Sequence, residues 1–210
     1  MVRRTREEAL ATRHRLLDAA EVVFHAQGVS RSSLSDIAQQ AGTTRGAIYW
    51  HFKDKADLFN AMMERVTLPL EASFKQVGQD PATDSLAGIR KAMRDALVQT
   101  ATDARTRRVF EVATHKVEYV DELQAVRQRH LTIRTECIAH IAHGLRLAAA
   151  QRSLRLPIPV ATAAQGLHAL VDGLIQNWLL EPTTFNLVTA GVRALDTYLA
   201  GLGFAPSLKR

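Results

Sequence analysis

A chain of 210 residues is long enough to bury a sizeable core without disulfide staples, and 47% hydrophobic with 23% charged residues is the composition of an ordinary globular protein. The balance of 27 basic and 21 acidic residues gives a formal net charge of +6, which favours an anionic partner such as nucleic acid or a membrane surface. The single cysteine, Cys137, excludes an internal disulfide and is typical of a reducing compartment.

The first residues, MVRRTREEALATRHRLL, are charged and lack the apolar segment of a secretory signal. No later stretch reaches the roughly 18 consecutive apolar residues of a membrane span. We therefore expect a cytoplasmic protein that does not enter a membrane. Because no phosphate-cradling glycine loop, paired-carboxylate motif or Ser-His-Asp order stands out, the sequence predicts neither an enzyme nor a cofactor.

Apolar residues recur at helical spacing nearly throughout, and no stretch shows sustained alternation of period two, so the sequence predicts an all-α protein. Three short helices are expected within the first 52 residues, the first closed by Gly28 and the second by Gly42. Further breakers separate or bound the later helices: residues 78–84, Pro157, Pro159 and Pro182.

This pattern indicates a small N-terminal module, residues 1–54, on a larger helical body, residues 55–210. Asp54 is a good N-cap and Asp57 follows it by three residues, so a helix beginning at Lys55 is expected to run from the module into the body. A helix shared by two modules transmits motion between them.

The stretch SSLSDIAQQAGTTRGAIYWHF has the pattern of a helix-turn-helix. Ser33 and Asp36 make a capping-box-like start to one short helix. Gly42 then supplies a left-handed residue, after which Thr43 or Thr44 caps a second short helix.

The second short helix carries three consecutive aromatic residues that cannot all be buried. Ile48 and Phe52 fall on one face and fix the direction of the core, so Trp50 points nearly opposite. Tyr49 and His51 lie on the flanks. Two interpretations stay open: these donors contact the phosphates of DNA, or Tyr49 and Trp50 fold back against neighbouring helices.

Residues 13–60 resemble the DNA-binding domain of the TetR family of one-component repressors, in the segments LLDAAEVVFHAQG, SLSDIAQQAG and TRGAIYWHFKDKADLF. The Tyr-x-His-Phe ending, with a lysine three residues on, is highly specific to that family. The segments DARTRRVFEV (103–112) and VDGLIQNWLLEP (171–182) extend the resemblance to the branch that represses multidrug efflux pumps.

The resemblance assigns contacts with DNA to individual positions. Arg3 and Arg4, ahead of the first helix, either follow the DNA or form a solvated terminus. Base-reaching positions hold Ser35, Arg45, Gly46 and Ala47; phosphate-contacting positions hold Tyr49, His51 and Lys55, with Trp50 as an addition; and Ser33, as the N-cap, would add a backbone contact.

The helix expected over residues 160–180 is apolar around most of its circumference and has one polar stripe of Gln165, His168, Asp172 and Gln176. From spacing alone, this stripe is either the solvent face or the lining of an internal cavity. The resemblance implies a drug pocket for hydrophobic compounds, surrounded by Val66, Ile89, Met93, Ala96, Phe110, Cys137, Ile141, His168, Val171, Asp172 and Gln176.

The resemblance also implies that the helices over 160–180 and about 184–201 pair with their copies in a second chain as a four-helix bundle. Such a homodimer would place two recognition helices to read a palindromic operator. The second of these helices has an apolar stripe of Leu187, Val188, Gly191, Leu195, Tyr198 and Leu199.

The function implied is that of a ligand-responsive transcriptional repressor, which binds a double-stranded DNA operator, controls a multidrug efflux operon and is released by hydrophobic small molecules. One alternative is a non-specific architectural DNA-binding protein, against which the long apolar body argues. Another is a metal-dependent enzyme built on Cys137, His140 and His143, but spacings of three and three spread these side chains over about 120° of helix.

Overall fold

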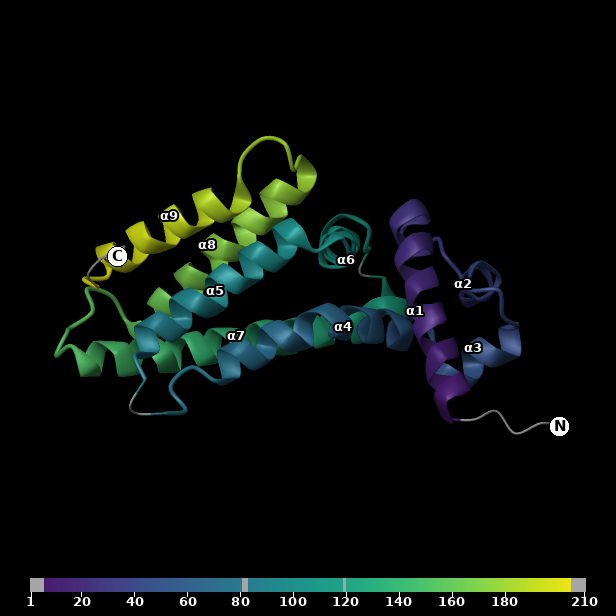
Figure 1. The fold of residues 1–210 in the computed structure, drawn as a ribbon, viewed down its shortest axis with the longest axis horizontal. Helices are drawn as coiled ribbons and strands as arrows, with labels where there is room; N and C mark the ends of the chain where they lie inside the picture. Colours follow the sequence, from purple (N-terminus) through teal and green to yellow (C-terminus); the bar gives the residue numbers. More distant parts are fainter. Residues whose placement is uncertain (1–5, 81–82, 119, 205–210) are drawn as a thin grey trace. The chain divides into compact units, whose positions relative to one another are not determined.

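The computed structural model describes residues 6–80, 83–118 and 120–204, and all regular secondary structure in these ranges is helical, which confirms the all-α prediction. The elements in chain order (Figure 1) are α1 (Arg6–Gln27), α2 (Leu34–Gln40), α3 (Arg45–His51), α4 (Lys55–Lys75), α5 (Ser85–Thr102), α6 (Ala104–His115), the short 3₁₀ helix η1 (Asp121–Leu123), α7 (Gln124–Gln151), α8 (Val160–Leu180) and α9 (Leu187–Gly201).

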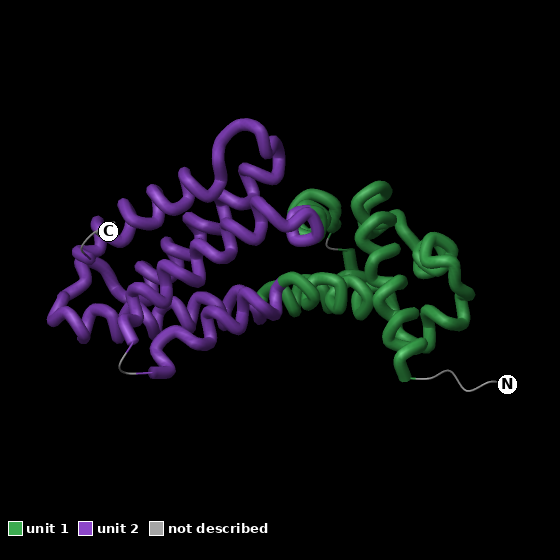
Figure 2. The backbone as a smooth tube through the Cα atoms, viewed as in Figure 1, with its two compact units in different colours: residues 1–66, 108–131 green, residues 67–107, 132–210 purple. Residues whose placement is uncertain are grey.

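The helices gather into two compact units (Figure 2). Unit 1 contains residues 1–66 and 108–131, and unit 2 contains residues 67–107 and 132–210. Three helices, α4, α6 and α7, contribute residues to both. This division by contacts differs from the functional boundary between residues 54 and 55, which stays a prediction.

The expectation of three short helices at the start of the chain is wrong for the first of them. Helix α1 has 22 residues. The negative charges of Glu7 and Glu8 in its first turn interact favourably with the positive end of the helix dipole. Gly28 ends α1 as predicted, since its φ of 83° is a left-handed conformation that glycine adopts without a steric cost. Arg3 and Arg4 lie outside the described residues.

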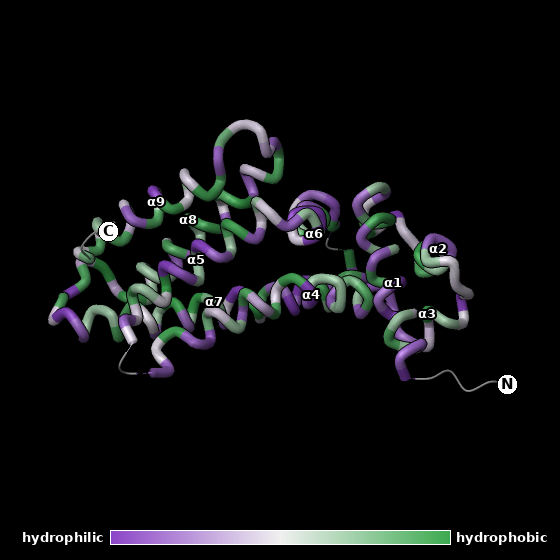
Figure 3. Tube along the Cα trace, in the orientation of Figure 1, coloured by the Kyte–Doolittle hydropathy of each residue, from purple (hydrophilic) through white to green (hydrophobic). Residues whose placement is uncertain are grey.

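The core of unit 1 joins the three N-terminal helices to the first half of α4 and to the 108–131 segment. Hydrophobic and hydrophilic positions are mixed along most helices, so each has a face to bury (Figure 3). The segment 108–131 contributes to the same core as the helix-turn-helix. The core of unit 1 includes Leu16, Leu17, Phe24, Ile37, Ile48, Phe52, Leu58 and Met62, and from the 108–131 segment it includes Val109, Val112, Leu123 and Val126.

In unit 2, α9 packs on both α5 and α8. Gly191 lets α9 approach α5 closely, because a Cβ there would come within 2.5 Å of a methyl carbon of Leu97. The Tyr198 hydroxyl donates a hydrogen bond to the Ala163 carbonyl of α8 at 3.0 Å.

The apolar stripe predicted for α9 is therefore used largely within the chain. Leu187, Gly191, Leu195 and Leu199 are buried in the single protomer. They are spaced four residues apart, which places them on one face of the helix. These four residues pack within the protomer, and the pairing of α8 and α9 with a second copy stays a prediction.

Gly144 of α7 marks a second close approach within unit 2. A Cβ at this position would lie 2.6 Å from Val77 Cγ1 and 3.0 Å from Ile89 Cδ1. We expect Gly144→Ala to destabilise the protein by about 1–2 kcal/mol, because the cost of overpacking exceeds the gain in helix propensity. Gly173→Ala in α8 is the matched control, because a Cβ built there meets no atom of the described residues within 4 Å outside the backbone of its own helix. Urea unfolding that ranks Gly144→Ala as no less stable than Gly173→Ala would contradict this packing.

Candidate DNA interface and ligand site

Helix α2 begins at a capping box, as predicted. The Ser33 hydroxyl oxygen accepts from the Asp36 backbone N–H at 3.1 Å, and the Asp36 carboxylate accepts from the Ser33 backbone N–H at 2.9 Å. The hydrogen bond from the Ser33 hydroxyl, followed by the one from its backbone, lowers the pKa of Asp36. The stabilisation is thus present above the unfolded pKa of this carboxyl and is lost as the pH falls through the lowered folded value.

The turn between α2 and α3 is held by backbone bonds. Gly42 is left-handed, with a φ of 62°, and the Thr43 N–H donates to the Ala38 carbonyl at 2.9 Å. Of the two threonines proposed as the next cap, Thr44 fills the position, since its hydroxyl accepts from the Ala47 N–H at 3.2 Å.

The structure shows whether Tyr49 and Trp50 of α3 point outward or fold back against neighbouring helices. Ile48 is fully buried, whereas 73% of Trp50 and 48% of Tyr49 are exposed, so neither ring folds back into the core of the chain. The Arg45 guanidinium lies 5.7 Å from the centre of the Tyr49 ring, and the His51 ring meets Trp50 edge-on at 4.5 Å. These contacts organise cationic and aromatic groups on one outward surface.

The backbone is also accessible on this surface. Among the described residues, and outside the backbone of its own helix, the one atom within 4 Å of a Cβ built at Gly46 is Thr44 Oγ1, at 3.9 Å, so packing in the described chain does not require a glycine here. A helix position without a side chain lets the backbone approach a ligand closely. The remaining predicted contacts divide by exposure: Ser33, Ser35 and Arg45 are exposed, and Ala47 and His51 are half-buried.

Lys55 lies in a different environment from the other predicted contacts. Its side chain is turned inward and only 6% of the residue is exposed. The ammonium donates to the carbonyls of Ser30 and Ser32 at 3.1 and 3.0 Å and lies 3.3 Å from the Glu122 carboxylate. The predicted phosphate contact by this side chain conflicts with the structure, because its donors are directed into the protein.

The predicted ligand residues are distributed over both units. In unit 1, Val66 is buried and Phe110 is half-buried against the core. In unit 2, the predicted residues come from α5, α7 and α8; Ile89 is one that packs directly on α7 at Gly144. Of that group, Ile89, Met93, Ala96, Ile141 and Val171 are buried, Cys137, His168 and Asp172 are half-buried, and Gln176 is exposed.

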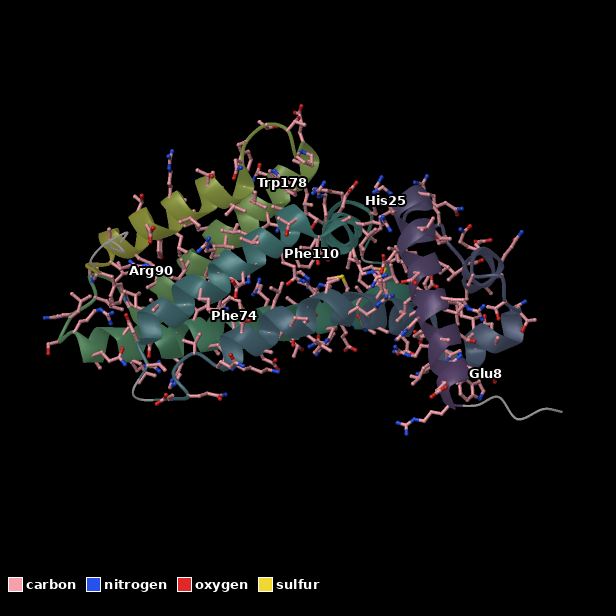
Figure 4. All side chains as sticks on the ribbon, in the orientation of Figure 1. Glu8, His25, Phe74, Arg90, Phe110 and Trp178 are labelled. Carbon is pink, nitrogen blue, oxygen red and sulfur yellow. The ribbon has the colours of Figure 1, made fainter. Side chains whose placement is uncertain are left out.

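The polar groups of α8 have identifiable partners in unit 2. The Gln176 amide donates to the Asp172 carboxylate at 2.6 Å. Near the end of the helix (Figure 4), the Trp178 ring is covered by the Arg107 guanidinium, 5.1 Å from the ring centre.

A separate open pocket of about 600 Å³, lined in part by Gln76 and Lys91, contains none of the predicted ligand residues.

The chemistry of Cys137 links α7 to this part of α8. Burial, together with the negative charges of Glu71 and Asp172, raises the pKa of the thiol to about 12. The thiolate is the nucleophile in alkylation, so at neutral pH the folded protein holds Cys137 as an unreactive thiol.

We expect iodoacetamide to alkylate Cys137 at pH 8 at least about 100-fold more slowly in the folded protein than in urea, because an unfolded cysteine has a pKa near 8.5. Hydrophobic compounds that enter the predicted pocket should slow labelling further. The rate can be followed by mass spectrometry. Equal rates in the folded and unfolded states would mean that the thiol is neither shielded nor shifted.

Three contacts of the structure could not be predicted from local sequence patterns. Arg13 lies 5.1 Å from the centre of the Phe52 ring, Glu122 pairs with Lys55, and Glu21 is buried between two arginines. Each joins residues far apart in the chain. The start of α6, in contrast, has a local capping pattern in the sequence: the Asp103 carboxylate accepts from the Thr106 N–H at 2.9 Å.

In the described ranges, no group of three or more His, Cys, Asp or Glu side chains is arranged to hold a metal ion. Nor does any helix of the described chain have the length and apolar character needed to cross a membrane.

A short helix, a glycine turn and a second short helix with an exposed Arg, Tyr and Trp surface define a helix-turn-helix protein of the DNA-binding class. The family profile described as "Bacterial regulatory proteins, tetR family" matches residues 16–62, and that of "MAATS-type transcriptional repressor, C-terminal region" matches residues 84–204. The chain belongs to the TetR family of bacterial regulatory proteins.

Individual relatives are similar over nearly the whole length. The HTH-type transcriptional regulator TtgR of Pseudomonas putida is 38% identical, with 100% of each chain covered. The crystal structure of NalD, the secondary repressor of the MexAB-OprM multidrug efflux pump in Pseudomonas aeruginosa, superposes with a TM-score of 0.84 at 32% identity, covering 94% of this chain and 98% of that one. The complex of SmeT, a Stenotrophomonas maltophilia repressor, with triclosan gives 0.83 at 32% identity, covering 94% and 96%.

Proposed function

We propose that this protein is a dimeric transcriptional repressor that binds a palindromic operator, controls a multidrug efflux operon and leaves the DNA when a hydrophobic compound binds. The observation that carries the proposal is the exposed α3 surface, on which Arg45, Tyr49 and Trp50 gather without a packing role. NalD and SmeT, both similar over most of the chain, are repressors of multidrug efflux pumps. The working compartment is the cytoplasm.

Residues 1–54 act as the DNA-binding domain in this proposal. Arg45 and Gly46, in the first turn of α3, are where a recognition helix reaches base edges in the major groove. Ala47 in the same turn and Ser35 in the first turn of α2 are the other base-reaching positions of this proposal. The phosphate contacts come from Tyr49, Trp50, His51 and the α2 N-cap at Ser33, whose donors suit phosphate oxygens.

Residues 55–210 act as the ligand-binding and dimerisation domain. The buried apolar residues of α5, α7 and α8 suit a hydrophobic inducer, and Asp172 and Cys137 add a few polar groups that fix its orientation. SmeT binds triclosan, a compound of this chemical class. The dimer contact falls on the α8 and α9 surfaces that the protomer leaves open, such as Leu180, which is 69% exposed.

Release from the operator uses the continuity of α4. This helix begins at Lys55, after the short 52–54 connection from α3, and continues to Lys75 in the body. An inducer that favours a different arrangement of the body thereby shifts the separation of the two recognition helices in the dimer. A coupling of about 1–3 kcal/mol, that is roughly 5–150-fold in operator affinity, is typical of such regulation.

A gel shift of the purified protein on the DNA upstream of its own gene tests the repressor proposal. Binding that survives an excess of random DNA supports it, and the affinity should fall steeply with salt. Equal affinity for every sequence would instead favour the alternative of an architectural DNA-binding protein.

A further inference from the structure

Lys55 stands at the first position of α4, where a cation is disfavoured by the helix dipole. It is nevertheless buried, and a buried ammonium is costly unless its donors are satisfied. Here two carbonyls, of Ser30 and Ser32, and the Glu122 carboxylate lie within 3.3 Å of the nitrogen. These contacts offset both the unfavourable helix dipole and the burial of the charge, so the Lys55 ammonium has specific partners inside unit 1.

The two carbonyls belong to the turn that leads directly into the DNA-binding helices. Ser32 precedes Ser33, the N-cap of α2, and the Ser32 hydroxyl itself donates to the Gly28 carbonyl at 2.6 Å. By binding both Ser30 and Ser32, the ammonium fixes the path of the α1–α2 turn. The direction in which α2 starts is thereby tied to the first residue of α4.

The third partner lies on the segment that completes the core of unit 1. Glu122 is in η1, and six residues earlier the Lys116 carbonyl accepts from the Val29 N–H of the same turn at 2.9 Å. The 108–131 segment therefore meets the α1–α2 turn at two places. One is a backbone bond, and the other passes through Lys55.

We propose that Lys55 is a positioning residue for operator binding, which acts by clamping the α1–α2 turn to α4 and to Glu122 of η1, and is not itself a phosphate ligand. The inference rests on the proposed function for its DNA readout. The lysine holds the N-cap of α2 in register with α3, and Glu122 holds the lysine.

The test compares Lys55→Met with Lys53→Met, which removes an exposed lysine from the loop just before α4. Operator affinity is measured over a salt series at a temperature where circular dichroism shows both variants fully folded. We expect Lys55→Met to lower operator affinity about tenfold or more, as expected for losing hydrogen bonds to a charged group, and to leave the slope of log affinity against log salt unchanged. A slope reduced by about 1 would show a lost phosphate contact and overturn the proposal.

A second variant, Glu122→Gln, keeps the proposal testable if Lys55→Met folds poorly. Glu122 is 60% exposed, so we expect a smaller loss of operator affinity and no added loss in the double variant beyond that of Lys55→Met. Additive losses, or operator affinity unchanged in both single variants, would contradict the clamp. A measurement on the DNA-free protein does not depend on which DNA is the operator. The melting temperature should fall for Lys55→Met but not for Lys53→Met.

Discussion

Replacing Arg65 with methionine is expected to lower the free energy of unfolding by about 3 kcal/mol, the low end of the cost of breaking a buried ion pair. Only 2% of the Glu21 side chain is exposed, and its carboxylate lies 3.5 Å from Arg65 and 3.6 Å from Arg108. Methionine keeps the apolar stem of the arginine but removes one of the two guanidinium groups that lie near the buried carboxylate. The cost is thus the loss of a charge partner for a buried carboxylate of unit 1.

Asp18→Asn is the matched control for that change. Asp18 pairs with the same Arg65 nitrogen at the shorter distance of 2.8 Å, but half of its side chain is exposed. Pairs of this kind contribute about 0–1 kcal/mol, because water screens the charges. Urea unfolding should separate the two variants clearly, and similar midpoints for both would show that burial of Glu21 does not set the energy of this cluster.

The second large effect is expected at Arg45, where alanine should weaken operator binding by about 1–3 kcal/mol and relax the base preference. Arg45 is exposed in the first turn of α3, where a recognition helix reaches base edges. Tyr49→Ala provides the comparison, because a phosphate contact carries no sequence information and its loss should weaken binding to all DNA alike.

Anisotropy titrations of both variants on operator and random DNA measure the difference. The Arg45 variant should lose more affinity on the operator than on random DNA. Equal losses on the two DNAs for Arg45→Ala would remove it from the residues that read bases. Arg45 also stacks on Tyr49, so the double variant is needed to separate their contributions.

Local signals in the sequence predicted much of the DNA-binding module. The Ser33–Asp36 capping box, the left-handed Gly42 and the start of α4 at Lys55 each depend on residues within four positions of one another. Such caps and turns are fixed by short-range sterics and hydrogen bonds. Periodicity likewise gave the buried Ile48 and the outward Trp50.

Apart from the length of α1, the features that the sequence did not predict concern long-range packing. Nothing near Lys55 in the sequence indicates that Glu122 and the Ser30 carbonyl will meet its ammonium, and the family pattern alone suggested DNA. The apolar stripe of α9 looks the same whether it faces its own chain or a partner. The burial of its leucines in the single protomer and the close approach of Gly191 to Leu97 show that it packs within the chain.

The most direct test of the account is titration of a preformed operator complex with hydrophobic antimicrobials, triclosan included, at fixed salt. We expect at least one compound to lower operator affinity by roughly 5–150-fold and also to slow alkylation of Cys137. A compound that protects Cys137 but leaves operator affinity unchanged would contradict ligand-controlled repression, since binding in the body would then have no consequence for the DNA.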